Sequence, residues 1–217
     1  MANEHLVELM DVMGTDDSVV DAARVSFDKE ASNYTQKDND RLLGFLAKHD
    51  HWSPFSHVML KFRITAPLFV ARQLAKHQVG FSWNEISRRY VSFSPSFWTP
   101  RGWRKRAEHI KQGSSEAFLS NSSKLLENYD SYMKNSLDFY DMLLGEGVCA
   151  EQARAVLPQS INTQWIWSGS LYGFWRVYSL RTHDTAQNET KAIAKDIAVH
   201  CSEKFPLSWN ALWRASQ

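Results

Sequence analysis

The stretch from His57 to Thr65 constrains the fold most, because its apolar residues recur at every second position. A two-residue repeat places alternate side chains on opposite faces of a β-strand. Pro67 follows, which suits the first turn of a helix, and apolar residues at helical spacing continue to about Gln78, before Gly80. The pattern predicts a strand with Val58, Leu60, Phe62 and Ile64 on its buried face, and then a helix that Gly80 ends.

Elsewhere in the chain, the predicted strands come early and the predicted helices late. Residues 6–13 predict a strand, and a helix is expected from about residue 14 to 25. Residues 92–113, rich in Pro, Ser, Trp and Arg, predict an irregular excursion. This order favours an α+β fold over a doubly wound sheet. Further helices are expected over about 36–48, 115–144, 151–157, 163–180, 186–204 and 210–215.

The size and charge of the chain exclude several classes of protein. A chain of 217 residues can bury roughly 70% of its unfolded surface, so we expect a single domain over residues 1–217. Apolar residues make up 43% and the formal net charge is +1, which indicates neither disorder nor a general affinity for polyanions. No apolar run reaches the length of a membrane span, and residues 1–5 lack the pattern of a secretion signal. We therefore expect a soluble, cytoplasmic protein without a membrane partner.

The cysteines and histidines give little support for a metal site. Cys149 and Cys201 lie far apart, and we expect both to be small core thiols. His49, His51 and His57 match no common zinc spacing, so a solvent-facing loop or a flat ligand is the better interpretation. No glycine-rich phosphate loop follows a strand, so side chains would have to hold any phosphate.

Residues 72–90 are dense in groups that bind anions. Glu85 alone predicts a solvated charge in a loop, and Ser87 alone predicts a turn or cap hydroxyl. The basic residues of segments that otherwise look packed indicate either ion pairs or a bound phosphate or carboxylate. They are Arg72, Lys76, Arg88, Arg89, Arg154 and Arg181. The cluster Arg101 to Arg106 permits nucleic-acid binding, but the low net charge favours a solvated loop or a subunit interface.

Several of these segments together resemble the flavin-dependent thymidylate synthases. That family carries an Arg-His-Arg signature followed by seven or eight residues and Ser; here the run is Lys76-His77-Gln78, eight residues, and Ser87. Other similar segments occur in the family's order, and the resemblance covers nearly the whole chain except about residues 94–125. They are residues 20–27, 53–57, 67–73, 153–158 and 180–181.

The resemblance implies an enzyme that converts dUMP to dTMP. Members take a methylene group from methylenetetrahydrofolate and reducing equivalents from NADPH through bound FAD, without an enzyme cysteine as nucleophile. The family fold is an antiparallel sheet flanked by helices, with long helices in the C-terminal half. It also implies a homotetramer with active sites between subunits. No metal is expected.

The resemblance further assigns residues to the nucleotide. Arg181 falls where a family arginine lies beside the uracil ring and favours its ionised form, so it is the catalytic candidate. A fixed cation there stabilises charge that spreads into the ring. The remaining nucleotide-binding candidates are Gln73, Lys76, Glu85, Ser87, Arg88, Arg89 and Arg154.

The flavin contacts implied by the resemblance differ from the family pattern at several positions. Lys76 and Gln78 replace the two arginines of the signature, and Thr185 stands where a histidine is common. His51 corresponds to a residue on the folate side of the flavin. The FAD-binding candidates are Ser53, Lys76, His77, Gln78, Glu85, Ser170, Tyr172 and Arg176. The altered signature leaves one alternative open: a catalytically degenerate nucleotide- or nucleic-acid-binding protein on the same fold.

Overall fold

A four-stranded antiparallel sheet forms the centre of the computed structural model, which describes residues 5–91, 93–108 and 113–217. The strands are β1 (Leu6–Met13), β2 (Met59–Pro67), β3 (Phe81–Glu85) and β6 (Asn162–Ser170), in the order β1-β2-β6-β3. The fold is α+β with helices flanking an antiparallel sheet, which confirms the predicted class.

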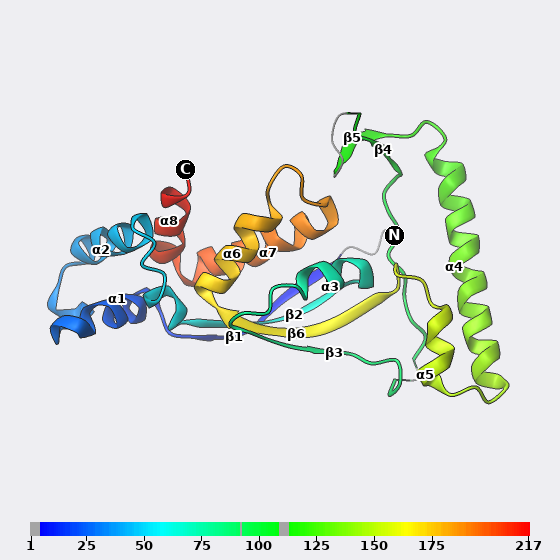
Figure 1. Ribbon diagram of the computed structural model, residues 1–217, viewed down its shortest axis with the longest axis horizontal. Coiled ribbons are helices and arrows are strands. Elements are labelled where there is room, and N and C mark those ends of the chain that lie inside the picture. Colours follow the sequence, from blue (N-terminus) through cyan, green and yellow to red (C-terminus); the bar gives the residue numbers. More distant parts are fainter. Residues whose placement is uncertain (1–4, 92, 109–112) are drawn as a thin grey trace.

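Helices cover one face of this sheet and both of its ends (Figure 1). Helices α3 (Leu68–Leu74), α6 (Leu171–Arg181) and α7 (Asn188–Lys204) lie on the covered face. At one end, α1 (Asp16–Arg24), α2 (Gln36–Lys48) and α8 (Pro206–Ala215) pack together, and at the other lie α4 (Ser122–Gly145) and α5 (Ala150–Ala153). Short 3-10 turns occur at Val25–Phe27, Ala31–Asn33, Pro54–Ser56 and Arg154–Val156.

The alternation in β2 produces the buried core. Val58, Leu60, Phe62 and Ile64 are fully buried, as predicted. The Phe62 ring packs edge-on against Phe174 with centroids 5.0 Å apart, which joins the sheet to α6. Burying one such phenyl ring contributes roughly 1.5–3 kcal/mol.

A glycine on β6 allows β3 to pair with it. Phe81 lies opposite Gly169 in the register, and a Cβ added at Gly169 would lie 2.3 Å from the Phe81 ring. Only glycine accommodates that approach. The Phe81 ring also lies 4.9 Å from that of Trp167, so aromatic packing holds the sheet together at β3.

The middle of the chain differs most from the prediction. Residues 163–170, expected to be helical, belong to the strand β6. Helix α3 ends at Leu74 rather than near Gln78, so Lys76 lies beyond it. Glu85, expected in a loop, is the last residue of the strand β3.

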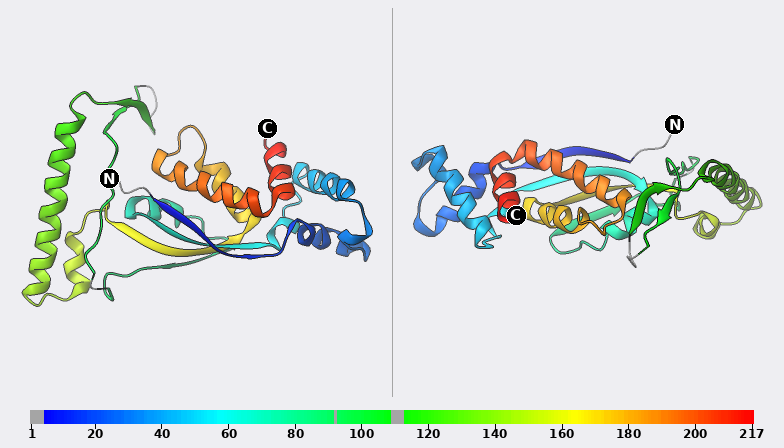
Figure 2. Two further views of the ribbon diagram at one scale, coloured as in Figure 1. Left: turned by 180° about the vertical axis from the view of Figure 1, so that it is seen from behind. Right: turned by 90° about the horizontal axis from the view of Figure 1, so that it is seen from above.

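The predicted irregular excursion contains a hairpin, although its residues 92 and 109–112 lie outside the described part. The hairpin consists of β4 (Arg104–Arg106) and β5 (Ser114–Phe118). Strand β5 takes up the start of the expected long helix, which begins at Ser122 instead of residue 115. Figure 2 shows the hairpin near the start of α7. Within the described ranges, no helix is long and apolar enough to cross a bilayer.

Candidate functional site

Three predicted site residues, Gln73, His77 and Arg181, come together where α3 and the turn after it meet the end of α6. Arg181 Nε donates to His77 Nε2 over 2.9 Å, and a terminal guanidinium nitrogen of Arg181 donates to the backbone oxygen of Gln73, also over 2.9 Å. Among the described residues, no carboxylate lies within 4.0 Å of this guanidinium. The cation is therefore oriented by neutral acceptors, and its charge is not neutralised.

His77 is neutral at physiological pH in this arrangement. Partial burial, and then the positive charges of Arg181 and Arg176, lower the pKa of His77 to about 4. A neutral imidazole that accepts at Nε2 carries its hydrogen on Nδ1. The ring therefore holds Arg181 in place and keeps one donor for another group.

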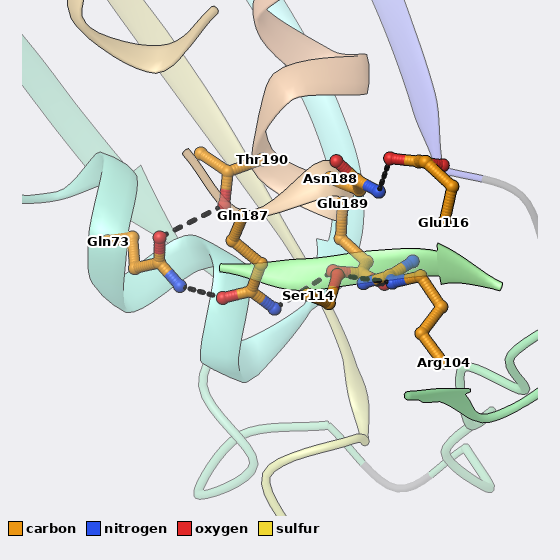
Figure 3. A network of polar contacts seen from close by, with 8 residues as sticks. All are labelled: Gln73, Arg104, Ser114, Glu116, Gln187, Asn188, Glu189 and Thr190. Carbon is orange, nitrogen blue, oxygen red and sulfur yellow. Dashed lines mark hydrogen bonds and ion pairs between the residues drawn. The ribbon is translucent and has the colours of Figure 1, made fainter. Parts of the chain in front are cut away.

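The Gln73 side chain belongs to a polar network at the start of α7 (Figure 3). Its Nε2 donates to Gln187 Oε1, and its Oε1 accepts from Thr190 Oγ1 over 3.2 Å. Gln187 Nε2 donates to Glu189 Oε2 over 3.0 Å, and Glu189 Oε1 pairs with Arg104 of the hairpin at 2.8 Å. The sequence did not predict these four partners, although polar residues at 187–190 begin a predicted helix.

Glu85 ends β3 instead of lying free in a loop. Its Oε1 accepts from Thr163 Oγ1 of β6 over 2.6 Å, and its Oε2 accepts from Trp83 Nε1 over 3.2 Å. The Trp83 ring stacks on Trp165 with centroids 4.6 Å apart. The exposed carboxylate is therefore held against the sheet.

The turn after β3 carries the predicted phosphate-binding group. Ser87 Oγ accepts from the backbone nitrogen and from Nε of Arg89, each over 3.4 Å. Arg88 donates to the Phe93 backbone oxygen over 2.6 Å. Arg154 lies elsewhere, in the 3-10 turn after α5, and is exposed.

Apart from Glu85 at the end of β3, the predicted flavin residues lie around the start of α6 and the turn after α3. Ser170 caps α6 by accepting from the Gly173 backbone nitrogen over 3.1 Å. The Tyr172 hydroxyl donates to Asp50 Oδ1 over 3.0 Å; burial, and then this bond, raises the pKa of Tyr172. Among these candidates, the exposed side chains are Ser53, Lys76, Gln78, Glu85 and Arg176.

Neither of two pockets formed by the described residues brings the predicted site residues together. A pocket of about 510 Å³ beneath the hairpin is lined by Trp98, Phe118 and Glu189, among others, and by none of the predicted ligand residues. Another, of about 260 Å³, includes Tyr172 and no other predicted site residue. The expectation that the basic residues lie in packed segments is also wrong for Arg72, Lys76, Arg89 and Arg154, which are exposed.

The cysteines and histidines occupy ordinary positions. Cys201 is buried, as expected, and burial raises its pKa, whereas Cys149 is exposed and so is not the core thiol that was predicted. The His49 ring packs 4.4 Å from that of Phe45, with His51 nearby. The described part of the chain has no group of three His, Cys, Asp or Glu residues that could hold a metal ion.

Comparison with known proteins identifies the family. Residues 8–207 match the family described as "Thymidylate synthase complementing protein". The flavin-dependent thymidylate synthase of Thermus thermophilus is 37% identical over 205 residues, which is 94% of this chain and 74% of that protein. The enzyme of the same name from Thermotoga neapolitana is 37% identical over 94% of this chain and 89% of its own length.

A solved structure agrees with these sequence matches. The UMP/dUMP methylase PolB from Streptomyces cacaoi, bound with 5-Br dUMP, superposes with a TM-score of 0.89 at 26% identity. The match covers 98% of this chain and 96% of that one. The chain therefore belongs to the flavin-dependent thymidylate synthase family and is an enzyme of the methyltransferase class.

Proposed function

We propose that this chain methylates dUMP to dTMP reductively, with methylenetetrahydrofolate as carbon donor, NADPH as reductant and FAD as bound cofactor. It does so in the cytoplasm, with residues 1–217 acting as one domain. The observation that carries the proposal is the Arg181 guanidinium, which is fixed by two neutral acceptors and not neutralised by a carboxylate among the described residues. The names of the relatives and the ligand of the structural neighbour support the same substrate.

Arg181 acts on the pyrimidine. A guanidinium has five N–H groups, and its bonds to His77 and Gln73 use two of them. The remaining donors bind the uracil carbonyls and the deprotonated N3, and so stabilise negative charge that is shared with C5. That carbon then attacks the methylene group of methylenetetrahydrofolate, and one bond from this group to a folate nitrogen breaks, with the electron pair going to the nitrogen. No covalent bond to the enzyme forms.

The nucleotide is held by amide, hydroxyl and arginine side chains. The arginines suit the phosphate, since a guanidinium can donate two parallel hydrogen bonds to phosphate oxygens. The residues assigned to the nucleotide are Gln73, Ser87, Arg88, Arg89 and Arg154. Within the described residues, neither Arg89 nor Arg154 has a carboxylate within 4.0 Å. Lys76 and Glu85 complete the nucleotide set.

Charge around His77 fits the pyrophosphate of FAD. Arg176 and Arg181 are close enough to lower the pKa of His77, and Lys76 is its exposed neighbour. We assign FAD binding to His77, Lys76, Gln78 and Arg176, with Ser53, Glu85, Ser170 and Tyr172. Bound FAD supplies hydride transfer from NADPH.

The active enzyme is a homotetramer with sites between subunits. Within one chain the nucleotide and flavin residues are spread along the sheet, with Ser170 at one end of β6 and Glu85 opposite Trp165 inside it. Helix α4 also carries exposed apolar side chains, including Tyr132, Phe139 and Met142. Such side chains are typical of a surface that another subunit covers.

No cysteine serves as nucleophile in this proposal. The Cys201 thiol is buried and its pKa is raised, so it yields little thiolate. Cys149 precedes the short helix α5 and lies outside the Gln73–Arg181 cluster. Ser87 is a ligand contact, not a nucleophile.

The purified protein, supplied with FAD, should oxidise NADPH and form dTMP only when dUMP and methylenetetrahydrofolate are both present. UMP is run in parallel, because the structural neighbour is a methylase of both nucleotides. Binding of dUMP without turnover would favour the degenerate binding protein instead. Failure to take up any flavin would refute the proposed chemistry.

A further inference from the structure

We propose that Glu189 is a positioning residue: together with Arg104, it decides which end of the Gln73 amide is turned toward the nucleotide. The inference rests on the proposed function only in assigning Gln73 to the nucleotide. The network itself is drawn in Figure 3 and connects the hairpin to α3 through the first turn of α7.

Of the residues that link the hairpin to Gln73 in this network, Arg104 and Glu189 have a fixed hydrogen-bonding character. The Arg104 guanidinium can only donate, and the Glu189 carboxylate can only accept. They are paired at 2.8 Å, and their side chains are 25% and 13% exposed. Ser114 Oγ also accepts from Arg104 Nε over 2.8 Å, which holds the guanidinium to β5.

The other members can turn around. The two ends of a glutamine amide have nearly the same shape, so Gln73 and Gln187 acquire a direction only from their neighbours. The Thr190 hydroxyl can donate or accept, and so it imposes no direction. Of the groups that contact the amides of Gln73 and Gln187, Glu189 is therefore the one that sets the direction of both amides.

The direction passes from Glu189 to Gln73 in two steps. Because Glu189 Oε2 must receive a hydrogen, Gln187 presents Nε2 to it and Oε1 to Gln73. Gln73 must then present Nε2 to Gln187, which leaves its Oε1 toward Thr190. One N–H and one lone pair of the Gln73 amide remain for the nucleotide, in a fixed arrangement.

Replacing Glu189 by glutamine should reverse the whole chain and not merely loosen it. In Glu189→Gln, Arg104 still requires an oxygen, so the new amide nitrogen faces Gln187. Gln187 then turns its oxygen toward position 189 and its nitrogen toward Gln73. The Gln73 amide must also turn, and its free donor and acceptor exchange places.

The swap of the two neighbours provides a rescue that a merely structural role does not predict. In the Gln187→Glu, Glu189→Gln double variant, Arg104 again receives an oxygen from position 189. The carboxylate at position 187 then accepts from both sides, so Gln73 keeps its native direction. The formal charge of the network is unchanged.

The matched control is Glu116→Gln. Glu116 lies on β5 and accepts from Asn188 Nδ2 over 3.2 Å, so it links the same hairpin to the same helix turn. This link is separate from the one to Gln73. A loss caused only by removing a carboxylate from the contact between the hairpin and α7 would appear in this variant too.

The direction of the amide and its consequence are measured separately. Selective ¹⁵N-glutamine labelling follows the side-chain NH₂ signal of Gln73, assigned by its loss in Gln73→Met. Calorimetry then gives the dissociation constant for dUMP with the FAD-loaded protein. In Glu189→Gln we expect the Gln73 signal to shift and the dUMP dissociation constant to rise on the order of 10-fold, as for one mispaired polar group.

The double variant should recover both the native Gln73 signal and a dissociation constant within about threefold of the unmodified protein, and Glu116→Gln should change neither. An unchanged Gln73 signal in Glu189→Gln would overturn the inference, as would a double variant that binds dUMP as weakly as Glu189→Gln. If the unmodified protein does not bind dUMP, the proposed function fails, while the NH₂ signal still decides how the amide is oriented.

Discussion

Replacement of Arg181 by alanine should remove most of the turnover while the enzyme still binds its flavin. In the structure, two N–H groups of this guanidinium bond to His77 and Gln73, which leaves three for the pyrimidine. Loss of one fixed, charged hydrogen-bond donor group lowers kcat about 10²–10³-fold, which corresponds to roughly 2.7–4 kcal/mol of lost transition-state stabilisation. The assay is dTMP formation at saturating dUMP, with the FAD content of each variant measured by absorbance.

Two further variants separate charge from geometry. Arg181→Lys keeps the charge, but one ammonium cannot reproduce the planar fork toward His77 and Gln73, so we expect an intermediate kcat. Lys195→Ala removes an exposed cation of α7 and should leave kcat unchanged. In Arg181→Ala the pKa of His77 should also rise from about 4, because the charge of Arg181 contributes to lowering it. An Arg181→Ala enzyme with normal kcat and normal FAD content would refute the role assigned to this residue.

Three more predictions concern pH, nucleotide binding and the core. Since the pKa of His77 falls from 6.5 to about 4 on folding, its neutral form contributes stability above pH 6.5 that is lost as the pH falls toward 4; for a half-exposed ring this amounts to about 1–2 kcal/mol, and His77→Gln should flatten that part of the urea-unfolding pH profile. Ser87→Ala should raise the dUMP dissociation constant about 3- to 10-fold and leave measurable turnover; lost turnover with intact binding would point to a nucleophile. Phe62→Ala, at a fully buried position, should cost about 3–5 kcal/mol of unfolding free energy, and a cost below 1 kcal/mol would show that the core is misplaced.

The sequence was most informative where one element carries its own periodicity. Helix α2 has the predicted bounds, and the alternation in β2 correctly gave its buried face. Both patterns involve residues close together in the sequence, so they can be recognised from a short segment alone. The fold class followed from the order of such elements.

The errors lie where pairing over long distances decides the structure. Strand β6 was expected to be helical because α6 follows it without a break, although Trp165 and Trp167 alternate with less buried residues. Strand β3 is short, and it exists because Phe81 fits over Gly169, far along the chain. No pattern among neighbouring residues predicts a contact between two segments so far apart in the sequence.

The candidate site was predicted only in part, because some of its contacts also join segments that are distant in the sequence. The resemblance selected the segments that contain Gln73, His77 and Arg181, and the structure brings these residues into contact, while their roles stay predictions. The contacts of Gln187 and Glu189 with Gln73 and Arg104 link segments that are distant in the sequence, and the sequence reasoning assigned them no role. Their polar side chains are ordinary for the start of a helix.

The most direct test of the central claim is a chemical analysis of the product formed by the purified, FAD-supplied protein from dUMP, methylenetetrahydrofolate and NADPH. We expect dTMP, formed with one NADPH consumed per nucleotide and absent when methylenetetrahydrofolate is omitted. NADPH oxidation without any methylated nucleotide, or no reaction by a protein that holds FAD and binds dUMP, would contradict it.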